Sequence, residues 1–207
     1  MYIIKDFLNK AEINHILSNI KEGWQAGYTN AGKHHKDNYE LIEQDCAEKI
    51  ASKIKSDPIA LTKLFIKRMT LPRFNLYKQN QYYKPHIDAF KQHGVQTDWS
   101  FTLMLHPATK GGDLKIEIDG ETKTIEQEAG DLVVYPSGNV HQVTSVIEGQ
   151  RIAAIGWIES LITSQEKRKI LSNIVDVLEI LEICGDKNIE LLKLSYSYHN
   201  LMRLWSK

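Results

Sequence analysis

The spacing of apolar residues divides the chain into three zones, and the first is helical. Residues 11–20 and 40–55 repeat their apolar side chains with a period near 3.6, which predicts two amphipathic helices. Asn9 stands where an N-cap of the first helix would lie. The glycine-rich stretch at 23–32 predicts irregular structure between the helices. Residues 1–62 are therefore predicted to form an N-terminal helical support region.

The period changes to two in the middle zone, residues 63–162. Seven segments alternate or run apolar in the manner of strands: 65–78, 100–106, 114–118, 122–125, 131–135, 140–147 and 151–158. Asp119-Gly120 lies between two of them and predicts a two-residue hairpin turn. Short strands joined by turns, without helices between them, predict an antiparallel sandwich or barrel. The expected fold is mainly β with flanking helices (α+β).

The third zone, residues 163–207, returns to the helical period. Residues 163–166 can form a capping box at the start of a helix. The predicted apolar stripe of this helix, which ends near Gly185, consists of Ile170, Ile174, Val177, Leu178 and Leu181. A second helix is predicted from about 188 to 205. Because this tail is too short for a core of its own, we expect it to pack on the sheet domain or on a second copy of the chain, as a candidate homodimer surface.

The composition narrows the class of protein. Lys plus Arg number 26 and Asp plus Glu also 26, so no excess of cations favours nucleic acid or an anionic membrane. No apolar run approaches the roughly 20 residues that span a bilayer, and the first residues lack the apolar core of a signal peptide. The two cysteines are too few for a disulfide scaffold. We expect a soluble, reduced, cytoplasmic protein that binds neither nucleic acid nor membranes.

Three residues form a candidate metal site. In an extended segment, residues two apart point to one face, so His86 and Asp88 would present an imidazole and a carboxylate to one point. His141 re-enters a strand after the turn at 137–139, at a strand mouth where barrel proteins gather ligands. A pair such as His86 and Asp88 also arises by chance. Together with His141 it matches the two-histidine, one-carboxylate triad of non-haem Fe(II) oxygenases.

Arg151 adds a fourth candidate residue. It stands ten residues after His141 and begins the very apolar segment 151–158. Burying an arginine is costly without an anionic partner, and a planar guanidinium can hold a carboxylate with two hydrogen bonds. If the strand is central, Arg151 requires a carboxylate. If Arg151 lies at the rim, it is solvated and requires none.

These residues stand in stretches that resemble a known family. The chain resembles the Fe(II)- and 2-oxoglutarate-dependent dioxygenases of the prolyl hydroxylase superfamily, and in particular the bacterial PKHD-type hydroxylases. The matching stretches are FNLY (74–77), HID (86–88), SFTLML (100–105), GGDL (111–114), AGDLVVYP (129–136), HQVT (141–144), GQR (149–151) and WIES (157–160). Residues 27–32 and 198–205 also resemble that family, so the likeness covers nearly the whole chain.

The resemblance implies a fold and a set of roles. The fold would be a double-stranded β-helix, a jelly roll whose open mouth holds the metal, followed by a helical C-terminal extension. His86, Asp88 and His141 would ligate Fe(II), and Arg151 would bind the distal carboxylate of 2-oxoglutarate. Tyr77 would line the cosubstrate pocket.

The same resemblance implies a reaction. The substrate would be hydroxylated with consumption of O2 and 2-oxoglutarate and release of succinate and CO2, with L-ascorbate as the reductant that maintains the iron. Asp88 retains the carboxylate that halogenating relatives replace, which favours hydroxylation. The expected substrate is a prolyl or similar side chain of a peptide or protein, with a small molecule as the alternative.

Two other functions fit the same residues. One is a non-catalytic jelly-roll sensor that binds metal or 2-oxoglutarate and signals through the helical tail. The other is a zinc hydrolase, which would need a general base near the metal, and Glu159 is the one nearby candidate. Two further histidines have open roles: His93 lies in the loop at 90–98 and can touch substrate, and His106 ends a predicted strand near the pocket.

Overall fold

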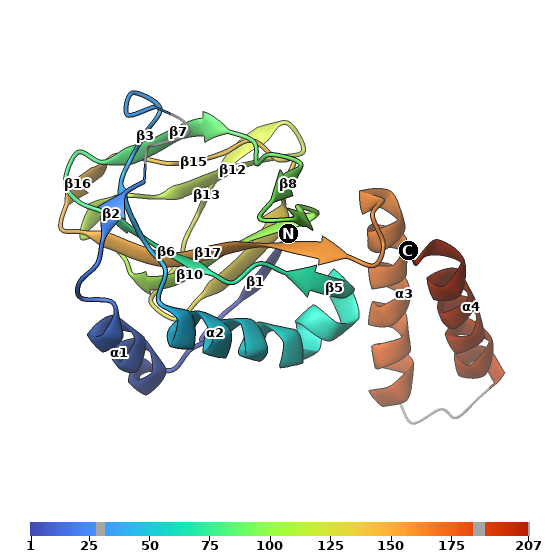
Figure 1. The fold of residues 1–207 in the computed structure, drawn as a ribbon. Coiled ribbons are helices and arrows are strands. Elements are labelled where there is room, and N and C mark those ends of the chain that lie inside the picture. The colour runs from blue at the N-terminus through green and yellow to red at the C-terminus, as the bar shows by residue number, and fades with distance from the viewer. Residues whose placement is uncertain (28–31, 184–188, 207) are drawn as a thin grey trace.

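Two antiparallel sheets form the centre of the molecule (Figure 1). The computed structural model describes residues 1–27, 32–183 and 189–206. Within these residues the larger sheet has eight strands, in the order β1 (Tyr2–Ile4), β14 (Leu132–Pro136), β10 (Trp99–His106), β17 (Arg151–Ser160), β6 (Arg73–Tyr77), β4 (Tyr39–Leu41) and β2 (Gln25–Ala26), with β5 (Ile66–Met69) also paired to β17. The smaller sheet has the order β13 (Glu121–Ile125), β12 (Leu114–Ile118), β15 (His141–Val143), β7 (Tyr82–His86) and β3 (Lys36–Asp37). The prediction of a mainly β core with flanking helices is confirmed.

Short two-stranded pairs extend the sandwich at its edges. They are β8 (Lys91–Gln92) with β9 (Val95–Gln96), and β11 (Lys110–Gly111) with β16 (Val146–Glu148). The predicted hairpin at Asp119-Gly120 is confirmed, because it joins the paired strands β12 and β13. Both turn residues have positive φ, 53° and 82°, the conformation that the tight hairpin turn requires and that Asp and Gly tolerate.

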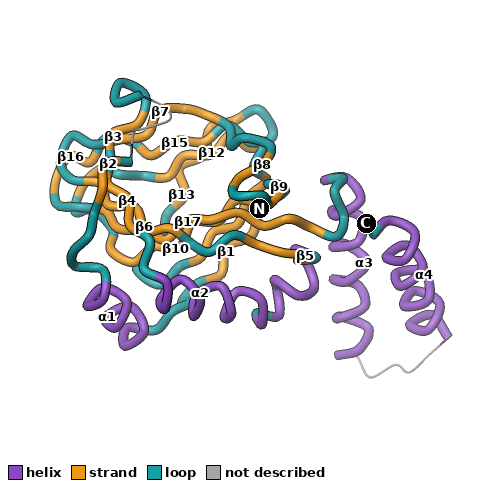
Figure 2. Tube along the Cα trace, in the orientation of Figure 1, coloured by secondary structure: helices purple, strands orange, loops and turns teal. Residues whose placement is uncertain are grey.

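The two faces of the large sheet have different partners. Helices α1 (Lys10–Asn19) and α2 (Gln44–Ser56) cover its outer face (Figures 1 and 2). Their apolar sides join the outward side chains of the central strands in one buried cluster, which includes Ile13, Ile16, Ile50, Ile54, Phe74, Leu76, Phe101, Leu103, Ile152 and Ala154. Since side chains alternate along a strand, the residues between these point toward the smaller sheet. The face of the large sheet that points toward the smaller sheet therefore lies outside this apolar cluster and can carry polar side chains.

Local signals decide where the elements begin and end. Asn9 caps α1 as predicted, with its side chain accepting from Ala11 and Glu12 N–H. The helix predicted over 40–55 is wrong at its start, because Tyr39–Leu41 pairs with β6 as strand β4 and α2 begins only after the cap residue Glu43. The pairing of 39–41 with β6 and the cap at Glu43 therefore decide where α2 begins, although the apolar spacing extends to earlier residues.

Two of the predicted strands are each two strands in the structure. The segment 65–78 is interrupted between β5 and β6, where Pro72 lies in a stretch without a ladder. The segment 140–147 is divided between β15 and β16, because the first pairs with β7 and the second with β11. The apolar alternation continues across such bends. It therefore does not show that the chain has begun to pair with a different strand.

The C-terminal zone forms a helical hairpin beside the sandwich, made of α3 (Gln165–Ile183) and α4 (Ile189–Trp205) (Figures 1 and 2). It packs on the sheet domain, the first of the two predicted alternatives, through a buried cluster of Phe65, Ile162 and Leu171 with part of α4. The predicted stripe on α3 is partly wrong, because Ile170 and Val177 are exposed while Leu171 and Val175 are buried. Gly185 lies outside the described residues.

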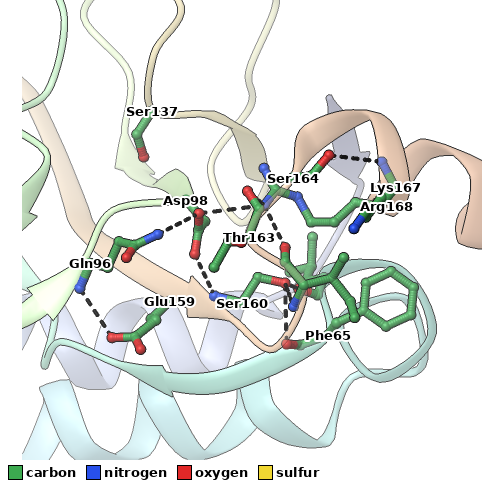
Figure 3. A network of polar contacts seen from close by, with 12 residues as sticks. Phe65, Gln96, Asp98, Ser137, Glu159, Ser160, Thr163, Ser164, Lys167 and Arg168 are labelled. Carbon is green, nitrogen blue, oxygen red and sulfur yellow. Dashed lines mark hydrogen bonds and ion pairs between the residues drawn. The ribbon is translucent and has the colours of Figure 1, made fainter. Parts of the chain in front are cut away.

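Polar contacts fix the beginning of this hairpin (Figure 3). Arg168 is buried, lies 3.4 Å from a carboxylate oxygen of Asp98, and donates to the carbonyls of Ile162 and Thr163. The capping box predicted with Thr163 as the cap is wrong, because the Ser164 hydroxyl caps the helix instead by accepting the N–H of Lys167. Arg168 accordingly faces the core and shifts the apolar face of α3. Among the described helices, none is long and apolar enough to span a membrane.

Candidate metal centre

Three donor side chains converge between the two sheets. His86 ends β7 and His141 begins β15, and the antiparallel register places the two residues directly opposite each other. Asp88 follows two residues after the end of β7. One ligand atom from each residue lies within 4.8 Å of the others, and His141 Nε2 is 3.7 Å from Asp88 Oδ2. The structure therefore brings together the three residues that the sequence predicts as metal ligands.

The backbone orients both imidazole rings. His86 Nδ1 lies 2.8 Å from the carbonyl oxygen of Lys84, and His141 Nδ1 lies 2.9 Å from that of Asn139. A carbonyl only accepts, so each Nδ1 carries the proton and each Nε2 keeps the free electron pair that binds a metal. Burial and then the neighbouring His141 ring lower the pKa of His86 to about 4. The His86 ring is therefore neutral at pH 7, the form that coordinates.

Aromatic rings surround the imidazoles. The Tyr83 ring stacks on His86 at a centroid distance of 3.5 Å, and Tyr135 meets His141 edge-on at 5.0 Å. Burial raises the pKa of Tyr83 to about 12, which keeps its phenol neutral beside the site. His35 approaches His86 at 6.3 Å. The sequence does not assign these three residues to the metal centre, because Tyr83 and Tyr135 lie on different strands and His35 in a loop, with no spacing that relates them.

A cavity of about 190 Å³ extends from the three donors to Arg151. Arg151 is 1% exposed and stands opposite Tyr77 in the β6–β17 register, with its guanidinium carbon 5.6 Å from the Tyr77 ring. Its Nε and Nη2 are buried, and neither finds a hydrogen-bond partner among the described residues. Burial lowers the pKa of Arg151, but a guanidinium stays protonated at neutral pH. The rim alternative for Arg151 is thus wrong: this cation is buried, and the part of the chain that the structure describes forms no ion pair with it.

The mouth of the cavity carries a chain of charged residues. Lys36 and Arg73 both pair with the Glu40 carboxylate, and all three line the cavity. His93 contacts Arg73 through its Nε2 and lies 6.4 Å from the Trp157 ring. His93 therefore lies next to two residues that line the cavity, Arg73 and Trp157, and its contact with a substrate stays a prediction.

Two other residues with open roles lie elsewhere. His106 is exposed and pairs with the carbonyl of Gln150, and it does not line the cavity. Glu159 is held by Arg68 at 2.6 Å and Lys67 at 3.4 Å, and it also lies outside the cavity lining. The zinc-hydrolase alternative therefore loses its candidate base, because a carboxylate that is bound by two cations and does not line the cavity is not placed to take a proton from a metal-bound water.

The donor set and its cavity have the chemistry of an Fe(II) and 2-oxoglutarate site. Two imidazoles and a carboxylate suit Fe(II) and leave coordination positions open. The buried, unpaired guanidinium of Arg151 fits an anionic cosubstrate. Residues 72–159 match the 2OG-Fe(II) oxygenase superfamily, so the site and the fold together define an oxygenase of that class.

Comparison with known proteins gives the family. The chain is 30% identical over its full length to a PKHD-type hydroxylase of Alteromonas mediterranea, 100% of which it covers. It belongs to the PKHD-type hydroxylase family. Among solved structures it resembles a prolyl-4-hydroxylase of Pseudomonas putida, with a TM-score of 0.64, 20% identity and coverage of 77% of this chain and 91% of that one.

A third protein shares the fold. It is a prolyl hydroxylase of Trichoplax adhaerens, solved in complex with a peptide fragment of the hypoxia inducible factor oxygen degradation domain. The TM-score is 0.60 with 18% identity, and the alignment covers 83% of this chain and 86% of that one. The predicted double-stranded β-helix core is confirmed by these structures.

Proposed function

We propose that this 2-oxoglutarate- and Fe(II)-dependent hydroxylase acts on a prolyl or similar side chain of a peptide or protein. The observation that carries the dependence on iron and 2-oxoglutarate is the shared cavity: the donor atoms of His86, Asp88 and His141 stand at one part of it, and the guanidinium of Arg151, with two nitrogens unpartnered among the described residues, stands at another. A metal site alone would need no buried arginine. A metal and a dicarboxylic cosubstrate together account for both.

Each residue has a specific role in this proposal. His86, Asp88 and His141 hold Fe(II), and Arg151 binds the distal carboxylate of 2-oxoglutarate through hydrogen bonds assisted by charge. Tyr77, which packs beside that guanidinium, forms the wall of the cosubstrate pocket. When bound, the iron supplies the reductive activation of O2 that is coupled to decarboxylation of 2-oxoglutarate. The protein contributes orientation, charge balance and exclusion of water.

A peptide substrate is supported by the surface around the metal position. Ile87, between His86 and Asp88, is 59% exposed, and Phe90, just before β8, is 74% exposed. Exposed apolar side chains this close along the chain to Asp88 offer a peptide apolar contacts next to the metal position. The peptide bound to the Trichoplax relative supports the same class of substrate.

The experiment is a measurement of turnover in two stages. First, the protein is incubated with Fe(II), 2-oxoglutarate and O2, with L-ascorbate as the proposed reductant, and succinate is measured. An oxygenase releases succinate slowly even without substrate, whereas a sensor releases none. Second, proline-containing peptides are added and examined by mass spectrometry for the gain of one oxygen atom. Succinate release together with hydroxylation confined to small molecules would contradict the peptide assignment.

A further inference from the structure

Two serines of the large sheet contact the carboxylate of Asp88. Ser100 lies on β10 and Ser137 directly follows β14, and each is 2% exposed. The Ser100 hydroxyl bonds to Asp88 Oδ2, and the two serine hydroxyls lie 2.7 Å apart. We propose that Ser100, supported by Ser137, is the positioning residue that orients Asp88 for metal binding. This inference rests on the proposed role of Asp88 as a ligand.

The direction of the hydrogen bonds follows from counting protons. The ionised Asp88 carboxylate only accepts, so the Ser100 hydroxyl donates its single proton to it. Ser100 then has only lone pairs for its second contact, and the Ser137 hydroxyl must donate to Ser100. The order is Ser137 to Ser100 to Asp88. A hydrogen bond to an ionised acceptor is roughly twice as strong as a neutral one, so the last step is the strong one.

The backbone closes this chain into a ring. The Asp88 N–H donates to the carbonyl oxygen of Ser137 at 3.2 Å, so Ser137 is linked to Asp88 both through Ser100 and directly. Ser137 is fixed in turn, because its N–H donates to the carbonyl of Asp98 at 3.4 Å. Figure 3 shows Ser137 next to Asp98, whose carboxylate is held by Gln96, Ser160 and Arg168.

The contacted oxygen is the one that faces the metal position. Asp88 Oδ2 is the oxygen that lies 3.7 Å from His141 Nε2. Asp88 follows β7 in a loop, so the strand ladder that holds His86 does not hold it. Each histidine is oriented through its own Nδ1, whereas the carboxylate depends on a hydroxyl from the opposite sheet. Ser100 therefore ties the ligand on the small sheet to the rigid centre of the large one.

The test is metal affinity, measured anaerobically by titration with Fe(II) and, in a second series, with Mn(II). Ser100→Ala is expected to weaken binding of either metal about 10- to 100-fold, the usual effect of removing a partner that orients a ligand. Ser137→Ala is expected to weaken it less, because the carbonyl of Ser137 still accepts from Asp88. Ser100→Thr keeps the hydroxyl and is expected to restore most of the affinity. The KM for 2-oxoglutarate at saturating metal is expected to stay unchanged in all three variants.

Ser160→Ala is the matched control. Ser160 is 1% exposed and its hydroxyl donates to the carbonyl of Leu64 at 2.9 Å, away from the metal position. This variant is expected to lose thermal stability while binding metal as the wild type does. If Ser100→Ala does not fold, Ser137→Ala and Ser100→Thr decide the matter by the same titration.

The failures are distinguishable. A wild-type protein that binds no divalent metal would overturn the proposed function itself. A wild-type protein that binds metal, with folded serine variants that bind it equally well, would overturn only the positioning role. Rescue of affinity by threonine but not by alanine is the result that a merely structural serine would not give.

Discussion

The two ends of the active cavity differ in how complete they are. At the metal end the protein itself orients each donor: carbonyl oxygens hold His86 and His141, and a serine hydroxyl holds Asp88. At the other end Arg151 is buried more deeply than His86 or Asp88, and two of its nitrogens find no partner among the described residues. At the metal end the protein supplies the hydrogen bonds that orient the donors, whereas at the Arg151 end an anion is needed to complete the hydrogen bonding.

This difference has an energetic meaning. A preformed donor set binds its ligand without reorganisation, because its rotamers are already locked. A buried charge without a partner instead costs stability, and the cost is recovered when a carboxylate binds. The metal end should therefore resist change in the absence of ligands, and the Arg151 end should gain stability when the cosubstrate is added.

The largest expected effect comes from removing a donor. Asp88→Ala or His141→Ala should reduce succinate formation to background, because each deletes one of the three metal ligands. The thermal unfolding curve should stay close to that of the wild type, since the donors stand at the cavity and outside the main apolar cluster. Full turnover in either folded variant would refute the assignment.

Arg151→Met tests the incomplete end. It should raise the requirement for 2-oxoglutarate by at least about 100-fold, because two hydrogen bonds assisted by charge are lost, each worth about 1.5–3 kcal/mol. Metal affinity should be retained. In the absence of cosubstrate its melting temperature should equal or exceed that of the wild type, because an unpaired buried charge has been removed.

The control for Arg151→Met is the stabilisation that the cosubstrate provides. Adding 2-oxoglutarate to the metal-loaded wild type should raise its melting temperature, because the ligand binds only the folded state. The same addition should have little effect on the variant. An unchanged KM for 2-oxoglutarate in Arg151→Met would remove this residue from the cosubstrate site.

Tyr77→Phe should have a smaller effect at the same end. Tyr77 is 1% exposed and packs beside the guanidinium of Arg151, and phenylalanine keeps its ring. Loss of one neutral hydroxyl contact should raise the KM for 2-oxoglutarate about tenfold or less. The measurement is steady-state succinate release, with kcat expected to stay near the wild-type value. A KM that does not move would show that the hydroxyl makes no contact with the cosubstrate.

The smallest effect is expected for Glu159→Gln. Glu159 pairs with Arg68 and Lys67, both of which are partly exposed, and such pairs contribute about 1 kcal/mol or less to stability. Succinate release should be unchanged, because this residue does not line the cavity. A large loss of turnover would show that Glu159 takes part in the reaction and would support the hypothesis that it acts as a general base.

The sequence predicts the metal end of the site well, because two of its donors are local. Residues two apart on an extended segment must share a face, so His86 and Asp88 follow from the pattern, and His141 follows from the turn that precedes it. The burial of Arg151 depends on whether its strand is central, which the sequence leaves open. Register with β6 decides it, and register is a property of the folded sheet.

The serines show why the remainder of the site escapes sequence reasoning. Ser100 lies in an apolar strand and Ser137 in a turn, and neither context distinguishes a support for a ligand from an ordinary small residue. Their role arises only when β10 and β14 pair and meet the loop that follows β7. The predicted apolar stripe of α3 is partly wrong for a similar reason, since the buried contact of Arg168 with Asp98 is not visible in the apolar spacing.

The most direct test of the central claim is the visible absorption of the protein with Fe(II) and 2-oxoglutarate under anaerobic conditions. Chelation of a bound Fe(II) by a 2-oxo acid gives a charge-transfer band. The wild type should show this band on addition of both components and with neither alone, and Asp88→Ala should show none. A wild-type protein that binds Fe(II) without giving the band when 2-oxoglutarate is added would contradict the account.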